Sequence, residues 1–211
     1  MKRPPDISWE EGFDWLKEKL KASHISYDLK IFGPKLKAYL AAFEKEAQAL
    51  NLTAAKSRFD LLAGPVYEAL FLAKYLPRNM TCADLGTGAG FPGLIVKIAR
   101  PDLRIFLVEG YPPRVSFMKK IVKELALEDV YPYLCHVGFQ NCPLKVSLVL
   151  ARGYGSPSKF LKHGREIFGA SQGLYLWRKD VEKCSLKKLP IKPVYCLPIS
   201  SRPVELLVFH F

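Results

Sequence analysis

The residues best suited to bind a ligand lie in the segment 82–99, CADLGTGAGFPGLIVKIA, where glycines recur between two apolar runs. Asp84 precedes three glycines at alternate positions, Gly86, Gly88 and Gly90. Glycines allow the chain to turn sharply and let the backbone approach a ligand closely. A helix that begins directly afterwards adds free N–H groups. The pattern therefore predicts a ligand-binding turn between a strand and a helix.

Two classes of nucleotide-bearing cofactor fit this turn. The letters GAGFPG at 88–93 match G-x-G-x-x-G, the fingerprint of dinucleotide-binding enzymes. The letters DLGTGAG at 84–90 match D-x-G-x-G-x-G, the first motif of class I S-adenosylmethionine-dependent methyltransferases. Both patterns expect an acid after the second strand to accept hydrogen bonds from ribose hydroxyls. Glu109 supplies that acid in either case, so it does not discriminate between them.

Three other features favour the methyltransferase. Asp84 fits an acid that faces the methionine end of the cofactor. A long helical segment precedes the motif, whereas a dinucleotide fingerprint usually stands near the start of its domain. The segment 193–211, PVYCLPISSRPVELLVFHF, predicts two strands joined by a tight turn, and such a final hairpin is typical of methyltransferases. A dinucleotide-dependent enzyme stays open as an alternative.

The elements that must position this turn alternate between strand and helix from residue 80 onward. Apolar runs predict strands at 80–85, 104–110, 130–135, 145–151, 173–177, 193–198 and 204–211, and helices at 92–101, 112–127 and 156–168. Strands that are apolar on both faces and alternate with helices indicate a mostly parallel sheet covered on both sides. We therefore expect an α/β fold of the Rossmann-like class I methyltransferase type, with a mostly parallel seven-stranded sheet.

The chain is expected to comprise an N-terminal helical segment, 1–79, and a methyltransferase core, 80–211. Gly33-Pro34 predicts a break between two helices of the first segment, and Gly64-Pro65 predicts an interruption in a later one. No apolar run approaches the roughly 20 residues of a membrane span, and the first residues lack the apolar core of a secretory signal. We expect a cytoplasmic protein with no membrane partner.

Charge and the remaining reactive side chains narrow the classes of function. Lys and Arg outnumber Asp and Glu by 32 to 20, and the net charge of +12 attracts polyanions such as nucleic acid. The five cysteines are scattered without a CxxC pair, which favours reduced thiols. The histidines stand apart without ligand spacing, so no metal site is expected. Neither Cys135 nor Cys142 follows the fourth strand, where pyrimidine-C5 methylases usually carry their nucleophile.

The segment 84–109, DLGTGAGFPGLIVKIARPDLRIFLVE, resembles a known family, the bacterial 16S ribosomal RNA (guanine-N7) methyltransferase G family, also called glucose-inhibited division protein B. The resemblance continues through 114–130, upstream to LNLTA at 50–54, and downstream to ARG at 151–153. It implies a class I methyltransferase fold, S-adenosylmethionine as cofactor, and methyl transfer to N7 of a guanine. The implied partner is 16S ribosomal RNA or the small ribosomal subunit, and we expect a monomer.

The resemblance also implies roles for single residues. Cofactor contacts are expected at Gly86 and Phe91, at Val137-Gly138 after the third strand, and at Arg152 after the fourth. Asn51 matches an Asn-Leu-Thr of the family near the catalytic pocket, so Asn51 and Arg152 are the expected catalytic residues. With the motif residues, the predicted cofactor set is Asp84, Gly86, Gly88, Gly90, Phe91, Glu109, Val137, Gly138 and Arg152.

This chemistry needs little from acids and bases. Guanine N7 carries a lone pair and no proton at neutral pH, so proximity and alignment supply most of the rate. Arg152 is suited to grip a carboxylate or a phosphate through paired N–H bonds. RNA contacts are expected from basic side chains that touch phosphates and from an aromatic ring that stacks on a base. The predicted set is Arg114, Lys119, Lys120, Lys123 and Tyr154.

The sequence departs from the family pattern in four places. A His and an Asp-Ser before the first motif are replaced by Pro65 and Glu68-Ala69, and a Lys-Arg after the second strand by Pro113-Arg114. An Arg-Ala-Glu-Glu after the third strand reads HVGF at 136–139, and a Lys-Gly after the fifth reads Arg178-Lys179. These departures keep a second function open, a diverged protein that binds cofactor and RNA with an altered substrate or weak activity.

Overall fold

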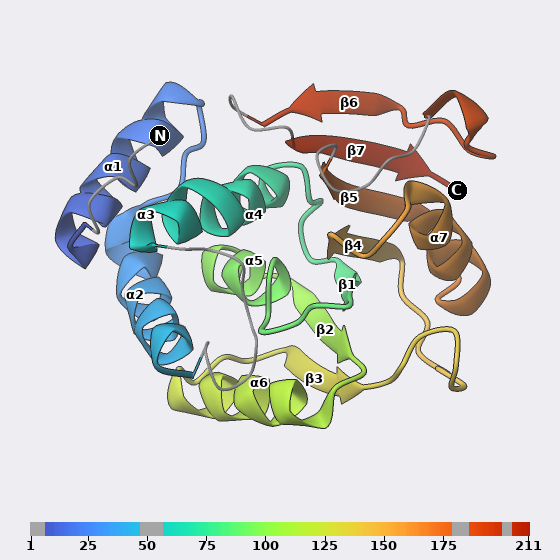
Figure 1. Ribbon diagram of the computed structural model, residues 1–211, viewed down its shortest axis with the longest axis horizontal. Coiled ribbons are helices and arrows are strands. Elements are labelled where there is room, and N and C mark those ends of the chain that lie inside the picture. The colour runs from blue at the N-terminus through green and yellow to red at the C-terminus, as the bar shows by residue number, and fades with distance from the viewer. Residues whose placement is uncertain (1–6, 47–56, 179–185, 200–203) are drawn as a thin grey trace.

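A single twisted sheet organises the chain, with helices on both of its faces (Figure 1). The computed structural model describes residues 7–46, 57–178, 186–199 and 204–211, without the side chains of 195–198. The strand order is β3-β2-β1-β4-β5-β7-β6. The strands are β1 (Thr81–Leu85), β2 (Arg104–Glu109), β3 (Val130–Leu134), β4 (Leu148–Arg152), β5 (Gln172–Arg178), β6 (Tyr195–Pro198) and β7 (Val204–His210).

The direction of the strands confirms the predicted topology. Strands β1 to β5 pair in parallel, whereas β7 runs antiparallel to both β5 and β6. The strand order in the sheet places β1 and β4 side by side near its centre. Because the two strands are parallel, the loops that follow them meet at one edge of the sheet. Ligands of open α/β sheets bind at this carboxyl edge.

The helices are α1 (Trp9–Ala22), α2 (Leu29–Glu46), α3 (Arg58–Leu61), α4 (Tyr67–Ala73), α5 (Gly93–Ala99), α6 (Pro112–Glu124) and α7 (Pro157–Lys162), with wider π-type turns at Leu62–Val66 and His163–Ile167 and a 3-10 turn at Leu186–Lys188. Ser156 caps the N-terminus of α7, because its side chain accepts a hydrogen bond from the Lys159 N–H. Among the described helices, none combines the length and the apolar character that crossing a membrane requires.

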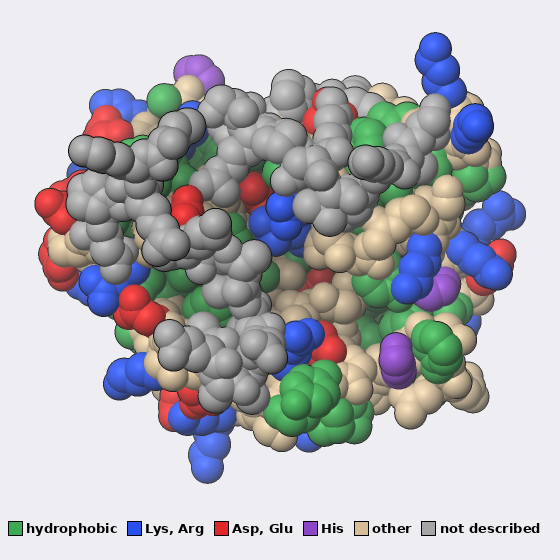
Figure 2. Space-filling model, viewed as in Figure 1, with side chains coloured by type: hydrophobic (Ala, Val, Ile, Leu, Met, Phe, Trp, Pro, Cys, Tyr) green, Lys and Arg blue, Asp and Glu red, His purple; other side chains and the backbone are tan. Residues whose placement is uncertain are grey.

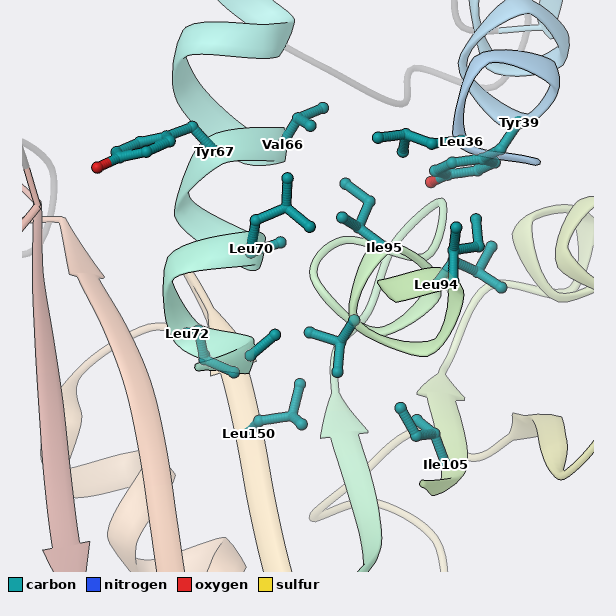
Figure 3. Packing of buried hydrophobic residues seen from close by; sticks show 14 of the residues in the cluster. Leu36, Tyr39, Val66, Tyr67, Leu70, Leu72, Leu94, Ile95, Ile105 and Leu150 are labelled. Atoms are coloured by element: carbon teal, nitrogen blue, oxygen red, sulfur yellow. The ribbon is translucent and has the colours of Figure 1, made fainter. Parts of the chain in front are cut away.

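Two hydrophobic cores lie on opposite faces of the sheet. Along β4, Leu148 and Leu150 face the core that the N-terminal helices share, while Val149 and Ala151 face the core under α7. This alternation follows from the two-residue period of a strand. Figure 3 shows the first core, where side chains of the sheet meet those of α2, α4 and α5: Leu150, Ile105, Leu70, Leu94, Ile95 and Tyr39.

One prediction about the N-terminal segment is wrong and another is confirmed. The structure has no break at Gly33-Pro34, because α2 runs through both residues. The proline removes only one helical hydrogen bond, and the apolar face continues across it; its buried members are Phe32, Leu36, Tyr39, Leu40 and Phe43. The interruption at Gly64-Pro65 is present, since Gly64 has non-helical dihedral angles of φ −108° and ψ −107°. The expected boundary after residue 79 stays a prediction.

Candidate functional site

The glycine-rich loop leaves β1 and is tied at once to the end of β2. The backbone N–H groups of Gly86 and Thr87 donate to the Val108 carbonyl at 2.9 and 3.1 Å. Gly86 and Gly88 have φ angles of +66° and +63°, which other residues rarely adopt. A Cβ atom added at Gly88 would meet no atom within 4 Å, so this part of the loop forms a bare ledge.

Asp84 holds the loop together from inside. Its carboxylate is fully buried and accepts hydrogen bonds from the Thr87 hydroxyl and from the Gly93 N–H, the latter at 2.7 Å. Burial raises the pKa of Asp84 to about 7. The other oxygen, Oδ1, has no hydrogen-bond partner among the residues that the structure describes. The nearby Gly90 lies within the turn, packed against Leu94.

Glu109 stands at the end of β2 and faces the ledge. Its side chain accepts hydrogen bonds from the Gly88 and Tyr111 N–H groups, both at 2.9 Å, and the residue is only 8% exposed. Arg114, at the start of α6, brings Nη1 to 3.9 Å from the same carboxylate. Each carboxylate oxygen can accept more than one hydrogen bond, so Glu109 can still bind hydroxyl groups of a ligand.

A pocket of about 360 Å³ opens at this carboxyl edge. Loops that follow β1, β2, β3 and β4 all contribute to it, as the topology requires. Its lining residues are Gly86, Val108, Glu109, Gly110, Tyr111, Cys135, His136, Val137, Tyr154 and Lys159. The pocket therefore combines a glycine ledge, one carboxylate, aromatic rings and an apolar wall.

Tyr154 forms the wall of the pocket over Gly86. Its ring lies 2.8 Å from where a Gly86 Cβ would stand, and its hydroxyl is 2.7 Å from Nδ1 of His163. Lys159 Nζ lies 5.2 Å from the centre of the same ring, and burial raises the pKa of the phenol well above its usual value. The structure thus places Tyr154 in the pocket, with one face occupied, instead of on an open surface.

Arg152 ends β4 and is held by an acid from another element. Its Nε donates to Glu68 Oε2 at 2.6 Å, and the Glu68 side chain is 2% exposed. Glu68 projects from α4, 84 positions earlier in the chain. In the sequence, Glu68 stands out only as a departure from the family pattern, and its contact with Arg152 becomes visible only in the structure.

The outer side of the glycine loop rests on the N-terminal helix α2. The buried Tyr39 hydroxyl donates to the Ala89 carbonyl at 2.9 Å. Phe91 packs against the rings of Tyr39 and Phe43, with ring centres 5.5 and 5.0 Å apart. Phe91 therefore points away from the pocket lining and anchors the loop to α2.

The predicted cofactor residues fall into three groups. Gly86, Glu109 and Val137 line the pocket, and Gly88 is bonded to Glu109 at its edge. Asp84, Gly90 and Phe91 shape the loop from behind, and Gly138 packs beside His163. Arg152 is outside the pocket lining and is bonded to Glu68 at the end of β4. Asn51 falls outside the described residues, so its position near the pocket stays a prediction.

The predicted RNA-binding residues lie along α6, apart from Tyr154. Lys119, Lys120 and Lys123 are exposed on this helix, and Lys120 pairs with Glu46 at 2.8 Å. Arg114 stacks on Tyr111 at 5.6 Å beside the pocket mouth. On the face shown in Figure 2, Lys and Arg side chains lie both at the margin and near the centre and do not gather in one patch.

Sequence reasoning missed several pocket residues. Tyr111 directly follows the acid-bearing strand end, and His136 immediately precedes the predicted Val137, so their neighbourhood was a usable signal. Glu68, which contacts Arg152 but does not line the pocket, gave a weaker signal as a charge among the apolar positions of its helix. Lys159 gave none, because Lys162 is also on its short helix. Within the described part of the chain, no group of His, Cys, Asp and Glu has the arrangement of a metal site.

Comparison with known proteins decides the family. The profile of the GidB family, described as rRNA small subunit methyltransferase G, matches residues 33–192, well over half of the chain. The chain belongs to the GidB family. This confirms the resemblance that the motifs around Asp84 and Glu109 indicated.

Relatives agree with this assignment, and a solved structure shares the fold. The ribosomal RNA small subunit methyltransferase G of Desulfotalea psychrophila is 41% identical over 104 residues, which span 49% of this chain and 48% of that protein. The protein of the same name from Francisella philomiragia is 26% identical over 182 residues, 84% of this chain and 88% of its own length. A crystal structure of a SAM dependent methyltransferase from Aquifex aeolicus has a TM-score of 0.54, with 17% identity over 71% of this GidB chain and 91% of that one. The predicted Rossmann-like methyltransferase fold is confirmed.

Proposed function

We propose that this GidB chain transfers a methyl group from S-adenosylmethionine to N7 of a guanine in small-subunit ribosomal RNA. The observation that carries the proposal is the pocket in which the Gly86–Gly88 ledge meets the Glu109 carboxylate, in a chain of this family. The alternative dinucleotide-dependent enzyme has no such support from the family match.

The residues of the pocket fit this cofactor. Gly88 leaves the ledge free of side-chain atoms, and Glu109 keeps acceptor capacity that suits two ribose hydroxyls. Val108 and Val137 line the part of the pocket where an adenine ring would need apolar contact. Arg152 offers a cation at the end of β4, where the methionine end of the cofactor would lie.

The residues of the chain then have to orient the cofactor and the guanine and to enclose them. When bound, S-adenosylmethionine supplies an electrophilic methyl group on its sulfonium. Because guanine N7 bears no proton at neutral pH, the protein needs no general base, and its contribution is alignment of the two reactants. Tyr154 and the loop after β3 line the pocket, where they would shield the reactants from water. Carbonyl and carboxylate oxygens beside the guanine would stabilise the positive charge that the ring gains.

Covalent catalysis by the cysteine of the pocket is not part of the proposal. Cys135 lines the pocket, but burial raises the pKa of its thiol to about 12. A thiol that stays protonated is a poor nucleophile, since the thiolate is the reactive form. This supports direct transfer to the guanine and leaves Cys135 a packing role.

RNA would approach over α6 and the pocket mouth. We infer phosphate contacts from Arg114, Lys119, Lys120 and Lys123, whose positions along one helix suit an extended backbone. Tyr154 lies inside the pocket, so its stacking on a base would require the guanine to enter beside it. We further propose that the protein works as a monomer in the cytoplasm, where small ribosomal subunits reside.

The test is methyl transfer from labelled S-adenosylmethionine to small ribosomal subunits that lack the modification, with the naked RNA in a parallel reaction. Label in the RNA, followed by strand cleavage at N7-methylguanine after reduction and aniline treatment, supports the proposal. Label on another base or position contradicts the N7 assignment. Binding of S-adenosylhomocysteine without any transfer supports the diverged binding protein instead.

A further inference from the structure

A largely buried ion pair lies at the end of β4, at the same carboxyl edge of the sheet as the candidate cofactor pocket. Glu68 is 1% exposed, and its carboxylate lies 2.6 Å from Arg152 Nε. Removing two charges from water costs free energy that their attraction often only balances, so such a pair is weak evidence for stability alone. The pair therefore points to a role in placing one of its members.

The contact with Glu68 leaves most of the Arg152 guanidinium available. A guanidinium carries five N–H donors, and the Nε bond to Glu68 uses one of them. The described residues offer no partner to the terminal Nη1 and Nη2 groups. The Arg152 side chain is nevertheless only 19% exposed. A guanidinium that is largely shielded from water and partly unpaired is suited to bind an anion with paired hydrogen bonds.

The strand order places Arg152 and Glu109 on either side of the glycine loop. Arg152 ends β4 and Glu109 ends β2, and these two strands flank β1, from which the loop leaves. Gly86 and Glu109 line the pocket, and Glu109 is the acid that the proposed function assigns to the ribose. A ligand anion at Arg152 must therefore be compact and must belong to the end of the cofactor away from Glu109. The amino-acid carboxylate fits this description, whereas an RNA phosphate is fixed to a bulky backbone.

We propose that Glu68 is a positioning residue, which fixes Arg152 so that its Nη groups bind the carboxylate of the cofactor's methionine end. The inference rests on the proposed function, because it assumes that cofactor. Glu68 reaches from α4, so the helix before the first motif takes part in cofactor binding without lining the pocket. The inference also gives a role to one position at which the chain departs from the family pattern.

Two ligands that differ only at the amino-acid end provide the test. S-adenosylhomocysteine has the carboxylate, whereas 5′-methylthioadenosine keeps the adenosine and the sulfur but lacks it. We expect Glu68→Gln to weaken S-adenosylhomocysteine binding about tenfold in calorimetric titration, or ~1.4 kcal/mol. Binding of 5′-methylthioadenosine should stay within about twofold, because its contacts do not involve Arg152. The matched control Glu18→Gln, at an exposed position of α1, should change neither affinity.

Further variants separate positioning from a general structural role. In an Arg152→Ala background, Glu68→Gln should have no additional effect on S-adenosylhomocysteine, since Glu68 acts only through Arg152. Arg152→Lys keeps the positive charge but loses the paired N–H donors of the guanidinium. It should also weaken S-adenosylhomocysteine binding and spare 5′-methylthioadenosine binding, and it replaces Glu68→Gln in the test if that variant does not fold. Equal losses for both ligands, or none for either, would overturn the inference. If the unaltered protein binds neither ligand, the proposed function fails and the inference fails with it.

Discussion

Replacing Gly88 with leucine should separate the stability of the fold from its binding of the cofactor. The backbone at Gly88 has a φ of +63°, and a Cβ there would meet no protein atom within 4 Å. The only folding penalty is then the left-handed backbone, about 1–2 kcal/mol for a residue with a Cβ. At about 2–4 °C per kcal/mol for a chain of this size, the melting temperature should fall by roughly 2–8 °C.

The effect of Gly88→Leu on binding should be much larger. The leucine side chain would occupy the bare ledge beside Glu109, where the ribose of the cofactor has to lie. We expect S-adenosylhomocysteine affinity to fall at least about 100-fold in calorimetric titration, which corresponds to about 2.7 kcal/mol. The protein should remain folded by circular dichroism, so the loss is attributable to the ledge.

Gly169→Leu is the matched control for this experiment. Gly169 has a nearly identical φ of +64°, is exposed, and would bring its Cβ only to 3.4 Å from the Lys145 side chain. It should show the same thermal shift with unchanged affinity. The reasoning is refuted if Gly88→Leu binds S-adenosylhomocysteine within threefold of the unaltered protein, or if Gly169→Leu loses as much.

Three further predictions follow from the contacts around the loop. The pKa of Asp84 is about 7 in the folded chain against 3.8 ordinarily, so its stabilising contribution is present below about pH 4 and declines as the pH rises towards 7. Relative to Asp84→Asn, the unaltered protein should lose about 3 kcal/mol of unfolding free energy between pH 5 and pH 8 in urea titrations, and a constant difference would contradict this. Tyr39→Phe leaves the Ala89 carbonyl without its hydrogen bond, so we expect about 1–3 kcal/mol less stability by urea unfolding, and an unchanged midpoint would argue against the contact. Glu109→Gln removes the carboxylate charge and one acceptor, so calorimetry should show S-adenosylhomocysteine binding weakened by about tenfold or more. Unchanged affinity would show that Glu109 does not contact the cofactor.

Local signals explain what the sequence could predict. The apolar runs that became β1 and β2, and the glycines between β1 and α5, carry their structure within a few neighbouring residues. The motif residues Gly86 and Glu109 both line the pocket, while their contact with the cofactor stays a prediction. The break predicted at Pro34 in α2 was wrong because the proline removes only one hydrogen bond, whereas the buried face of the helix extends across it.

Contacts between distant segments explain what the sequence could not predict. Glu68 meets Arg152 only after α4 has packed on the sheet, and no spacing rule connects positions 84 residues apart. The family resemblance implies a cofactor contact at Phe91, whose ring packs against those of Tyr39 and Phe43 on α2 and is outside the pocket lining. Its contact with the cofactor stays a prediction. The side of a loop that faces a pocket depends on such packing, which the order of residues does not state.

The most direct measurement is a crystal structure of the protein soaked with S-adenosylhomocysteine. We expect density for the ligand along the ledge from Gly86 to Gly88, with the ribose hydroxyls on the Glu109 carboxylate and the amino-acid end towards Arg152. An empty ledge at a saturating ligand concentration, or the ligand bound elsewhere on the chain, would contradict it.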